Sequence, residues 1–229
     1  MLVSPDFPNV SRFTVAISKE DVLNWIKTYA QVIAENEALL TDLDAQIGDA
    51  DHGANMNRGF KAVLTKLPAQ EDKDISTILK TVGMTLLSTV GGAGGPLYST
   101  IFLELGKTLA NKEEIDLADW ANALEAAEKG VQNRGKAVPG DKTMIDALEP
   151  AVIALKEALA QNLSFEEALK KSAEAAHEGM LATIPLVARK GRASYLGERS
   201  AGHQDPGATS TYFLIDTAAK TWAKQNTHK

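Results

Sequence analysis

Apolar residues recur at helical spacing along most of this 229-residue chain. Ser18 and Asp21 form a capping-box pattern, and the apolar period after them continues as far as Leu43. No segment shows sustained alternation rich in β-branched residues, so a sheet is not expected. The sequence therefore predicts an all-α bundle of about eight amphipathic helices. The other helices are expected over 55–67 and 74–88, and from near Pro96, Asp116, Asp141 (with a kink at Pro150), Ser164 and Pro206, the last to about Lys224.

The composition indicates one domain and excludes several classes of protein. With 44% hydrophobic residues the chain can bury a sizeable core, and we expect a domain over 18–229 after a loosely ordered arm over 1–17. The net charge of −6 argues against nucleic-acid binding. There is no membrane-length apolar run, no signal peptide and no cysteine, which is compatible with a cytoplasmic protein.

An acidic segment follows the first predicted helix and carries three carboxylates, Asp44, Asp49 and Asp51. Such close acids repel one another unless a cation neutralises them, and Mg²⁺ prefers carboxylate oxygens. Gly48 and Gly53 would let the backbone leave helical geometry here. The alternative, a solvated acidic helix end, would oppose the helix dipole. We therefore predict a magnesium site.

Two familiar motifs are excluded on their residues. An EF-hand starting at Asp49 would need an oxygen ligand at Gly53 and a Glu at Phe60. The segment 130–137 matches the glycines and lysine of a Walker A loop, but Ala137 replaces the hydroxyl residue and no buried strand precedes it. The segment is interpreted as the end of a helix.

A glycine-rich loop, Gly91–Gly95, separates two predicted helices. Its backbone N–H groups could bind a phosphate in front of the helix that Pro96 starts. A tight interhelical turn explains the glycines equally well. The acidic cluster in the same chain favours the phosphate interpretation, because phosphoryl transfer needs both features.

A basic segment completes the set of candidate functional loops. It contains four cations within eleven residues of an acidic chain: Arg189, Lys190, Arg192 and Arg199. They could supply a local positive field for a polyphosphate, although a solvated basic loop remains the alternative. Asp205-Pro206-Gly207 follows as a turn and helix start that could also clamp a flat ring. The predicted functional loops are 44–55, 91–95, 135–144 and 191–207.

Six motifs follow one another along the chain, namely Gly48–Gly53, Val90–Ala93, Gly95–Leu97, Arg134–Lys136, Pro139–Met144 and Lys190–Ser210. In these motifs and their order the chain resembles the DhaL family, the nucleotide-binding subunits of bacterial dihydroxyacetone kinases, whose fold also forms the nucleotide domain of single-chain ATP-dependent kinases. The likeness extends from about Ser18 to Ala223. It implies a closed barrel of eight antiparallel amphipathic helices with the nucleotide at one end.

The resemblance also implies roles for individual residues. Two Mg²⁺ ions that bridge the phosphates would be held by Asp44, Asp49 and Asp51. The phosphates of ADP or ATP would be lined by His52, Gly53, Ala54, Asn55, Ala93 and Gly94. The purine would be bordered by Gly135 and Met144 and covered by Asp205, Pro206 and Gly207. Arg192 would be a catalytic cation near the terminal phosphate. Many relatives carry Ser where this chain has Gly94, so one hydroxyl donor is missing.

The partners follow from the same resemblance. The implied reaction recharges bound ADP to ATP from a phosphohistidine-carrying phosphotransferase subunit, and passes the phosphate to dihydroxyacetone on a separate kinase subunit. Two alternatives stay open, a subunit that exchanges ATP freely and a non-catalytic ADP/ATP-sensing module that binds a transcriptional regulator. Retention of the three acids and Arg192 weakens the non-catalytic alternative. His177 and His228 are expected to be structural or exposed.

Overall fold

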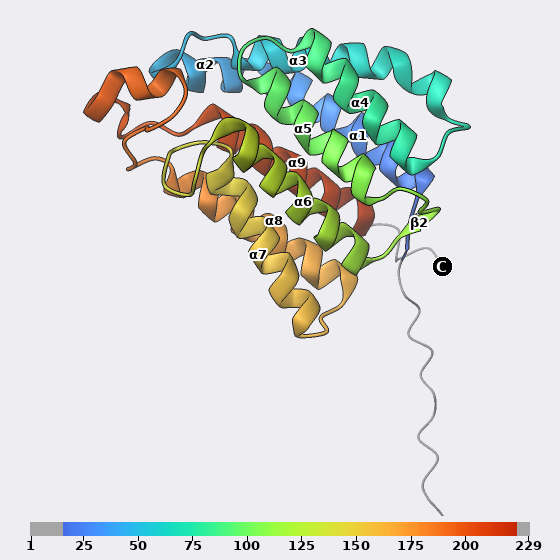
Figure 1. Ribbon diagram of the computed structural model, residues 1–229. Helices are drawn as coiled ribbons and strands as arrows, with labels where there is room; N and C mark the ends of the chain where they lie inside the picture. Colours follow the sequence, from blue (N-terminus) through green and yellow to red (C-terminus); the bar gives the residue numbers. More distant parts are fainter. Residues whose placement is uncertain (1–15, 224–229) are drawn as a thin grey trace, which may run out of the picture.

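The computed structural model describes residues 16–223, which form a bundle of nine α-helices (Figure 1). The predicted arm falls almost wholly outside these residues. The helices are α1 (Lys19–Glu35), α2 (Glu37–Ile47), α3 (His52–Lys66), α4 (Ile75–Thr89), α5 (Gly94–Thr108), α6 (Leu117–Gly135), α7 (Ile145–Ala160), α8 (Phe165–Ala182) and α9 (Pro206–Ala223). Two 3-10 helices, η1 (Leu67–Gln70) and η2 (Arg192–Ser200), lie between them.

The helix starts confirm the capping patterns seen in the sequence. Ser18 and Ser164 each accept a hydrogen bond from the backbone N–H of the third helical residue, and the acids at that position bond back to the cap. Asp74 and Asp116 cap α4 and α6 through their own carboxylates, and at α6 Asp119 also bonds back to the cap. Local side-chain chemistry therefore determines where four of the helices begin.

Four boundaries differ from the prediction, one of them the start of α7, which lies at Ile145 and not near Asp141. The first helix does not run to Leu43, because it ends at Glu35 and α2 begins at Glu37. The residue between them, Asn36, donates from its side-chain amide to the carbonyl of Val32 at 2.8 Å. The helix expected from Pro96 begins two residues earlier, at Gly94. The second predicted helix begins at His52, because α3 starts directly after the acidic segment.

Two short strands were not expected. β1 (Ile17–Ser18) pairs in antiparallel register with β2 (Glu114–Ile115), and Ile17 lies opposite Ile115. Strands of two residues are too short for alternation of polar and apolar residues to appear in the sequence. The pair fixes the start of the described chain beside the start of α6, although Ile17 was assigned to the arm.

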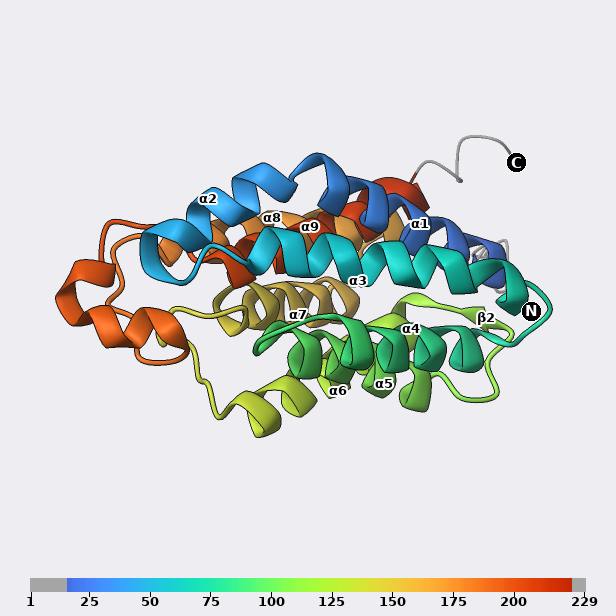
Figure 2. The same ribbon diagram turned by 90° about the horizontal axis from the view of Figure 1, so that it is seen from above.

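Eight of the helices form a closed ring. Successive helices from α3 to α9 pack against each other, α9 packs against α1, and α1 packs against α3, while α2 continues beyond α1 and packs on α3. Neighbours run in opposite directions, as Figure 2 shows from above. The antiparallel barrel that the family resemblance implied is thus the observed fold. None of the helices within residues 16–223 is both long enough and apolar enough to span a membrane.

The two ends of the barrel differ in content. At one end the three tryptophans Trp25, Trp120 and Trp222 pack together with centroid distances of 4.9–5.5 Å. This end, called the aromatic end below, also contains the β1–β2 pair and both ends of the described chain (Figure 1). The four predicted functional loops meet at the opposite end, called the pocket end.

Candidate functional site

A pocket of about 440 Å³ opens at the pocket end, and all four predicted loops contribute to its walls. The acidic segment, the glycine-rich loop and the basic segment line one part of it. Apolar side chains of α5, α6 and α7 line another, namely Leu97, Val131 and Ile145. The pocket therefore has a charged region beside an apolar region, which suits a ligand with an anionic part and an aromatic part.

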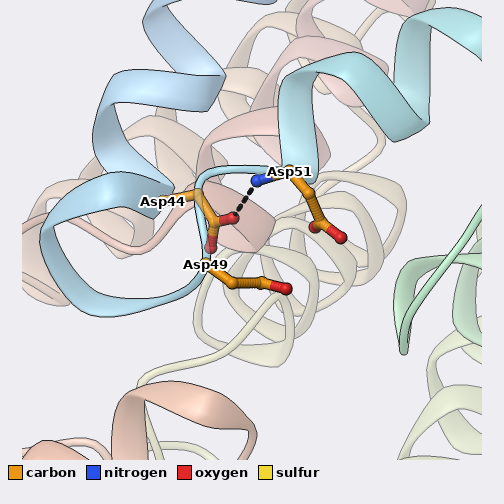
Figure 3. Close-up of side chains that lie close together, drawn as sticks. All are labelled: Asp44, Asp49 and Asp51. Carbon is orange, nitrogen blue, oxygen red and sulfur yellow. Dashed lines mark hydrogen bonds between the residues drawn. The ribbon is translucent and has the colours of Figure 1, made fainter.

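The three acids converge at the entrance to α3 (Figure 3). One carboxylate oxygen from each of Asp44, Asp49 and Asp51 lies within 4.8 Å of the others. Asp44 is buried in the last turn of α2, and its Oδ2 accepts hydrogen bonds from the backbone N–H groups of Asp51 at 2.8 Å and His52 at 3.1 Å. These two bonds fold the loop back so that the acids face one point.

Both glycines of the acidic segment allow close approaches. A Cβ at Gly48 would lie 2.0 Å from Oδ1 of Asp44, and one at Gly53 would lie 2.1 Å from the carbonyl oxygen of Glu37. Gly53 is helical, so its role differs from the predicted one: it lets α3 pack against α2. Ala50, with a φ of 60°, takes the left-handed conformation in the turn between them.

The acid cluster fits a divalent cation by its chemistry. It offers three carboxylate oxygens within a small space, the donor type that Mg²⁺ prefers. Arg192 Nη1 lies 2.9 Å from Oδ2 of Asp49, so positive charge already approaches the cluster from η2. Metal binding by these residues remains a prediction at this point.

The glycine-rich loop lies directly against α3. Gly92 has a φ of 61°, and a Cβ at Gly95 would lie 2.3 Å from the carbonyl oxygen of Val90. A Cβ at Gly91 would lie 3.0 Å from Oδ1 of buried Asn55, so the loop sits closely on that side chain. The loop ends in the first turn of α5, whose free N–H groups and dipole face the pocket.

His52 is held by a hydrogen-bonded chain that leads into the core. Its Nε2 lies 2.9 Å from Oγ of Ser210, and the hydroxyl of Tyr98 lies 2.6 Å from the same atom. Burial lowers the pKa of His52, although the carboxylates of Asp44 and Asp51 oppose this. Burial raises the pKa of Tyr98 to about 12. Burial therefore favours the neutral imidazole, and the hydrogen bond to Ser210 holds the ring at the wall of the pocket.

The opposite wall joins the ends of α6, α7 and α9. Met144 is buried immediately before α7, and a Cβ at Gly207 would lie 3.6 Å from the backbone nitrogen of Met144. Asp205 is buried and accepts a hydrogen bond from the N–H of Ala208 at 2.7 Å, which caps α9. Burial raises the pKa of Asp205 to about 7.

The segment that resembles a Walker A loop is the end of α6, as interpreted from the sequence. The helix ends at Gly135, and Lys136 closes it in the left-handed conformation with a φ of 52°. Gly135 lines the pocket next to Leu97. The lysine therefore terminates a helix and does not belong to a phosphate-binding loop of that type.

The basic segment is partly helical, which the sequence did not indicate. Of its four cations, Lys190 and Arg192 line the pocket. The side chain of Arg192 is 64% exposed and reaches the pocket from the start of η2, which projects beyond the bundle (orange in Figure 2). Arg199 lies exposed at the end of η2, away from the pocket lining.

The structure gathers most of the predicted site residues and adds others. All of them line the pocket except Gly53, which packs on α2, and Ala54, which is exposed. Reasoning from the sequence missed Tyr98 and Lys142, which also line it. A tyrosine or a lysine on a helical chain gives no signal by itself, but Lys142 lies within the Pro139–Met144 motif that carries the family resemblance.

Comparison with known proteins agrees with this geometry. Residues 46–220 match the DAK2 domain. The chain is 47% identical over 205 residues to the "PEP-dependent dihydroxyacetone kinase, ADP-binding subunit DhaL" of Escherichia coli K12, a match that covers 90% of this chain and 98% of the relative. It is 43% identical over 203 residues to the corresponding subunit of kinase 1 of Listeria innocua, covering 89% and 96%.

A solved structure shares the fold as well. The dihydroxyacetone kinase of C. freundii in its native form superposes with a TM-score of 0.69 at 25% identity, over 96% of this chain. The chain spans 38% of the length of that kinase. The same kinase has also been solved in complex with AMP-PNP and Mg²⁺, with a TM-score of 0.66. The family match over most of the chain, together with relatives of nearly equal length, leads to one conclusion: this chain belongs to the DAK2 domain family.

Proposed function

We propose that this protein is the ADP-binding subunit of a phosphoenolpyruvate-dependent dihydroxyacetone kinase. In this reaction a phosphohistidine-carrying phosphotransferase subunit converts the bound ADP to ATP. The γ-phosphate then passes to dihydroxyacetone on a separate kinase subunit and gives dihydroxyacetone phosphate. The observation that carries the proposal is the convergence of three acids, a glycine-rich helix start and a cation on one pocket. The E. coli and L. innocua relatives, named for this activity, support it.

The acid cluster is proposed to hold two Mg²⁺ ions through Asp44, Asp49 and Asp51. When bound, these ions would neutralise phosphate charge and orient the phosphates for transfer. The protein supplies the alignment: the two backbone hydrogen bonds to Asp44 hold the loop so that the acids face each other. The carboxylates repel one another without a cation, so this arrangement favours cation binding.

The remaining lining residues are assigned to the two parts of the nucleotide. The phosphates would lie between α3 and the start of α5, against His52, Asn55, Ala93 and Gly94, with the backbone of Gly53 and Ala54 nearby. The purine would lie against Gly135 and Met144, under Asp205, Pro206 and Gly207. The apolar side chains of α5, α6 and α7 there exclude water from a flat aromatic ring.

Arg192 is proposed as the catalytic cation. Its guanidinium lies 2.9 Å from the carboxylate of Asp49, at an exposed position on the pocket rim. A terminal phosphate could replace this carboxylate as the partner of Arg192. A guanidinium at this position would balance the charge of the phosphoryl group during transfer. Its exposure also fits a site that two partner subunits must approach in turn.

The proposal also covers partners and location. The partners are a dihydroxyacetone-binding kinase subunit and a phosphohistidine-carrying subunit. A transcriptional regulator as a further partner stays a prediction without support from the site. A cytoplasmic location is part of the proposal and rests on the relatives being named as subunits of phosphoenolpyruvate-dependent kinases.

The decisive experiment follows bound nucleotide through many turnovers. The protein is loaded with radiolabelled ADP, mixed with phosphoenolpyruvate, the partner subunits and dihydroxyacetone, and chased with excess unlabelled ADP. Label that stays on the protein while product accumulates supports a fixed ADP/ATP cofactor. Label lost within about one turnover would instead make this an ATP-exchanging kinase subunit.

Arg192→Glu provides the matched test of the site. The variant should keep most ADP binding, because the side chain lies at the rim, and should lose phosphoryl flow to dihydroxyacetone. The control is Arg199→Glu, which makes the same change on η2 away from the pocket lining. Equal activity in the two variants would contradict the role of Arg192.

A further inference from the structure

A buried lysine outside the proposed catalytic group joins two distant parts of the chain. The side chain of Lys142 is 1% exposed. Its Nζ donates to the carbonyl oxygens of Thr183 at 2.7 Å, Leu186 at 3.1 Å and Ile184 at 3.3 Å, and also to that of His203. Three of these acceptors lie within the four residues that follow α8, and the fourth lies three residues before α9. The ammonium group therefore binds both ends of the segment between these helices.

That intervening segment, 187–202, contains η2 and Arg192. Its two ends are also joined by the bond from the N–H of Gly202 to the carbonyl of Ile184, at 2.7 Å. Within it, the N–H of Ala188 donates to Oγ of Ser200 at 2.8 Å. We call 187–202 the η2 segment. The two ends of the η2 segment, called its base below, meet around the ammonium of Lys142. On the other side of the segment, Arg192 contacts Asp49.

The backbone around Lys142 is itself held in place. Lys142 has a left-handed φ of 63°, which a residue with a side chain rarely adopts. Asp146 at the start of α7 accepts hydrogen bonds from the N–H groups of Gly140 at 2.6 Å and Thr143 at 2.7 Å. The N–H of Arg189 donates to the carbonyl of Asp141 at 3.0 Å. The loop thus presents the lysine toward the base of the η2 segment in one fixed geometry.

A lysine fits these acceptors better than other cations do. Its ammonium is a compact point charge with three rotatable donors, one of which is shared between two of the four carbonyl oxygens, whereas the planar guanidinium of arginine directs its N–H groups in one plane. Burial lowers the pKa of Lys142, and the carboxylates of Asp205 and Asp146 oppose this. Oriented carbonyl dipoles solvate the charge, as water would at the surface.

We propose that Lys142 is a positioning residue that keeps the η2 segment closed at its base, so that Arg192 stays at the phosphate end of the pocket. The inference rests on the function proposed above and extends it, because it assigns the placement of the catalytic cation to a residue in another loop. Lys142 acts through Arg192 and does not itself transfer the phosphoryl group.

The absence of cysteine from the chain allows a test with one unique side chain. Lys142→Cys is alkylated in denaturant and refolded in two forms. An S-aminoethyl group restores an ammonium at nearly the reach of lysine, and an S-propyl group has the same length without charge. If the S-propyl protein does not refold, Lys142→Gln takes its place, since it keeps an N–H donor but loses the charge and the reach.

The first measurement is hydrogen exchange at the amides of Ala188 and Gly202, without nucleotide. We expect exchange at least about tenfold faster in the S-propyl protein, because its η2 segment opens locally, and rates near wild type in the S-aminoethyl protein. Amides of α4, on the opposite side of the ring, are the internal control. Equal protection of the two amides in both forms would overturn the proposal.

The second measurement is a double-mutant cycle with Arg192→Gln, read as phosphoryl transfer in the reconstituted system. The S-propyl group alone should lower kcat nearly as far as Arg192→Gln does, with little change in ADP affinity. It should cause no further loss when Arg192 is already replaced. Independent, additive losses would mean that Lys142 does not act through Arg192. If Arg192→Gln itself has no effect on transfer, the proposed function fails, while the exchange result still decides the role of Lys142.

Discussion

The aromatic end and the pocket end of the barrel are stabilised in different ways. At the aromatic end, Trp25, Trp120 and Trp222 are each at most 2% exposed, and two of their indole N–H groups donate to backbone carbonyls. Apolar burial and satisfied polar groups act together there. At the pocket end, acids face one another, Asp205 and Lys142 are buried, and an alanine and two lysines take left-handed conformations, whereas at the aromatic end only asparagines among the described non-glycine residues do so.

This difference indicates that the two ends of the barrel have different roles. Mutually repelling acids and strained backbone reduce stability unless a ligand compensates. The well-packed end and the core between the helices must therefore hold the barrel together when the pocket is empty of charge-neutralising ions. Mutations at the aromatic end should therefore lower stability, whereas mutations at the pocket end should mainly lower ligand affinity.

Trp120→Ala should have the largest effect, and it should lower stability without changing ligand affinity. Trp120 packs edge-on against Trp25 at 5.5 Å and Trp222 at 4.9 Å, so its removal leaves a cavity. We expect the free energy of unfolding to fall by about 3–5 kcal/mol, measured by chemical denaturation. Calorimetry on the folded variant should give an ADP affinity near wild type. A large loss of affinity would show that the two ends are coupled.

Asp205→Asn should change how stability depends on pH. The native state keeps a proton on Asp205 up to about pH 7, whereas the unfolded chain releases it near 3.8. The native state thus binds more protons between these values, and its unfolding free energy falls as pH rises from about 4 to 7. The variant should lack this fall and gain about 1–3 kcal/mol over wild type across that range. Denaturation at several pH values measures it.

Asp74→Asn is the matched control at the opposite end. Asp74 also caps a helix, but hydrogen bonds from the backbone N–H and the hydroxyl of Thr77 lower its pKa. Its contribution to stability is present above about pH 3.8 and is lost as pH falls through the lower native pKa. The variant should therefore lose stability near neutral pH and recover relative to wild type in acid. If the stability of both variants relative to wild type changed in the same direction with pH, the proposed difference between the two ends would be contradicted.

Asp51→Asn should weaken ligand binding without weakening the fold. It removes one of three acids that lie within 4.8 Å, so the protein without ligand should be as stable as wild type or slightly more stable. Affinities for Mg²⁺ and ADP should fall together, by at least the roughly 10–100-fold typical of losing an outer-shell metal partner. Calorimetry measures both. Unchanged ADP affinity would contradict the assignment of a metal site to these acids.

Chelation gives the same test without mutation. EDTA should lower the melting temperature of the ADP-loaded wild-type protein, because ligand binding stabilises the native state by mass action. It should have little effect on loaded Asp51→Asn. A melting temperature of the wild-type protein that does not respond to EDTA would count against bound metal.

Gly94→Ser should have the smallest effect, and it should be favourable. A Cβ at Gly94 would lie 3.4 Å from Cγ1 of Val90, an ordinary contact, so the backbone can accept a serine here. The added hydroxyl should tighten ADP binding by about 1.5 kcal/mol or less, near the lower value for a hydrogen bond to a charged group. Gly92→Ser is the control, because its φ of 61° makes the same change strained. Weaker binding in Gly94→Ser would contradict the contact.

The sequence predicted best those structural features that depend on interactions between residues a few positions apart. Capping boxes at Ser18 and Ser164 act within one helical turn, so the sequence shows them directly. The break at Asn36 coincides with a hydrogen bond from its side chain to the carbonyl of Val32, whereas apolar periodicity alone favours one long helix. The strand pair joins residues about one hundred positions apart, and such pairings leave no short-range pattern.

The same distinction applies to the site. The acids and glycines of the first two loops are close in sequence, and their chemistry could be predicted from spacing. Gly135 and Met144 came only from the family resemblance, since a glycine at a helix end and a methionine are common without function. Lys142 could not be predicted, because its acceptors lie 41 to 61 residues further along the chain.

The two ends of the described part of the chain lie at the aromatic end, and this has a practical consequence. The strand β1 and the last turn of α9 both lie at the end of the barrel opposite the pocket (Figure 1). A surface attachment made at β1 or at the end of α9 would therefore hold the molecule with its pocket directed outward. Immobilised in this orientation, the protein could be presented in turn to each proposed partner, and the competition between the two partners could be followed on a sensor surface.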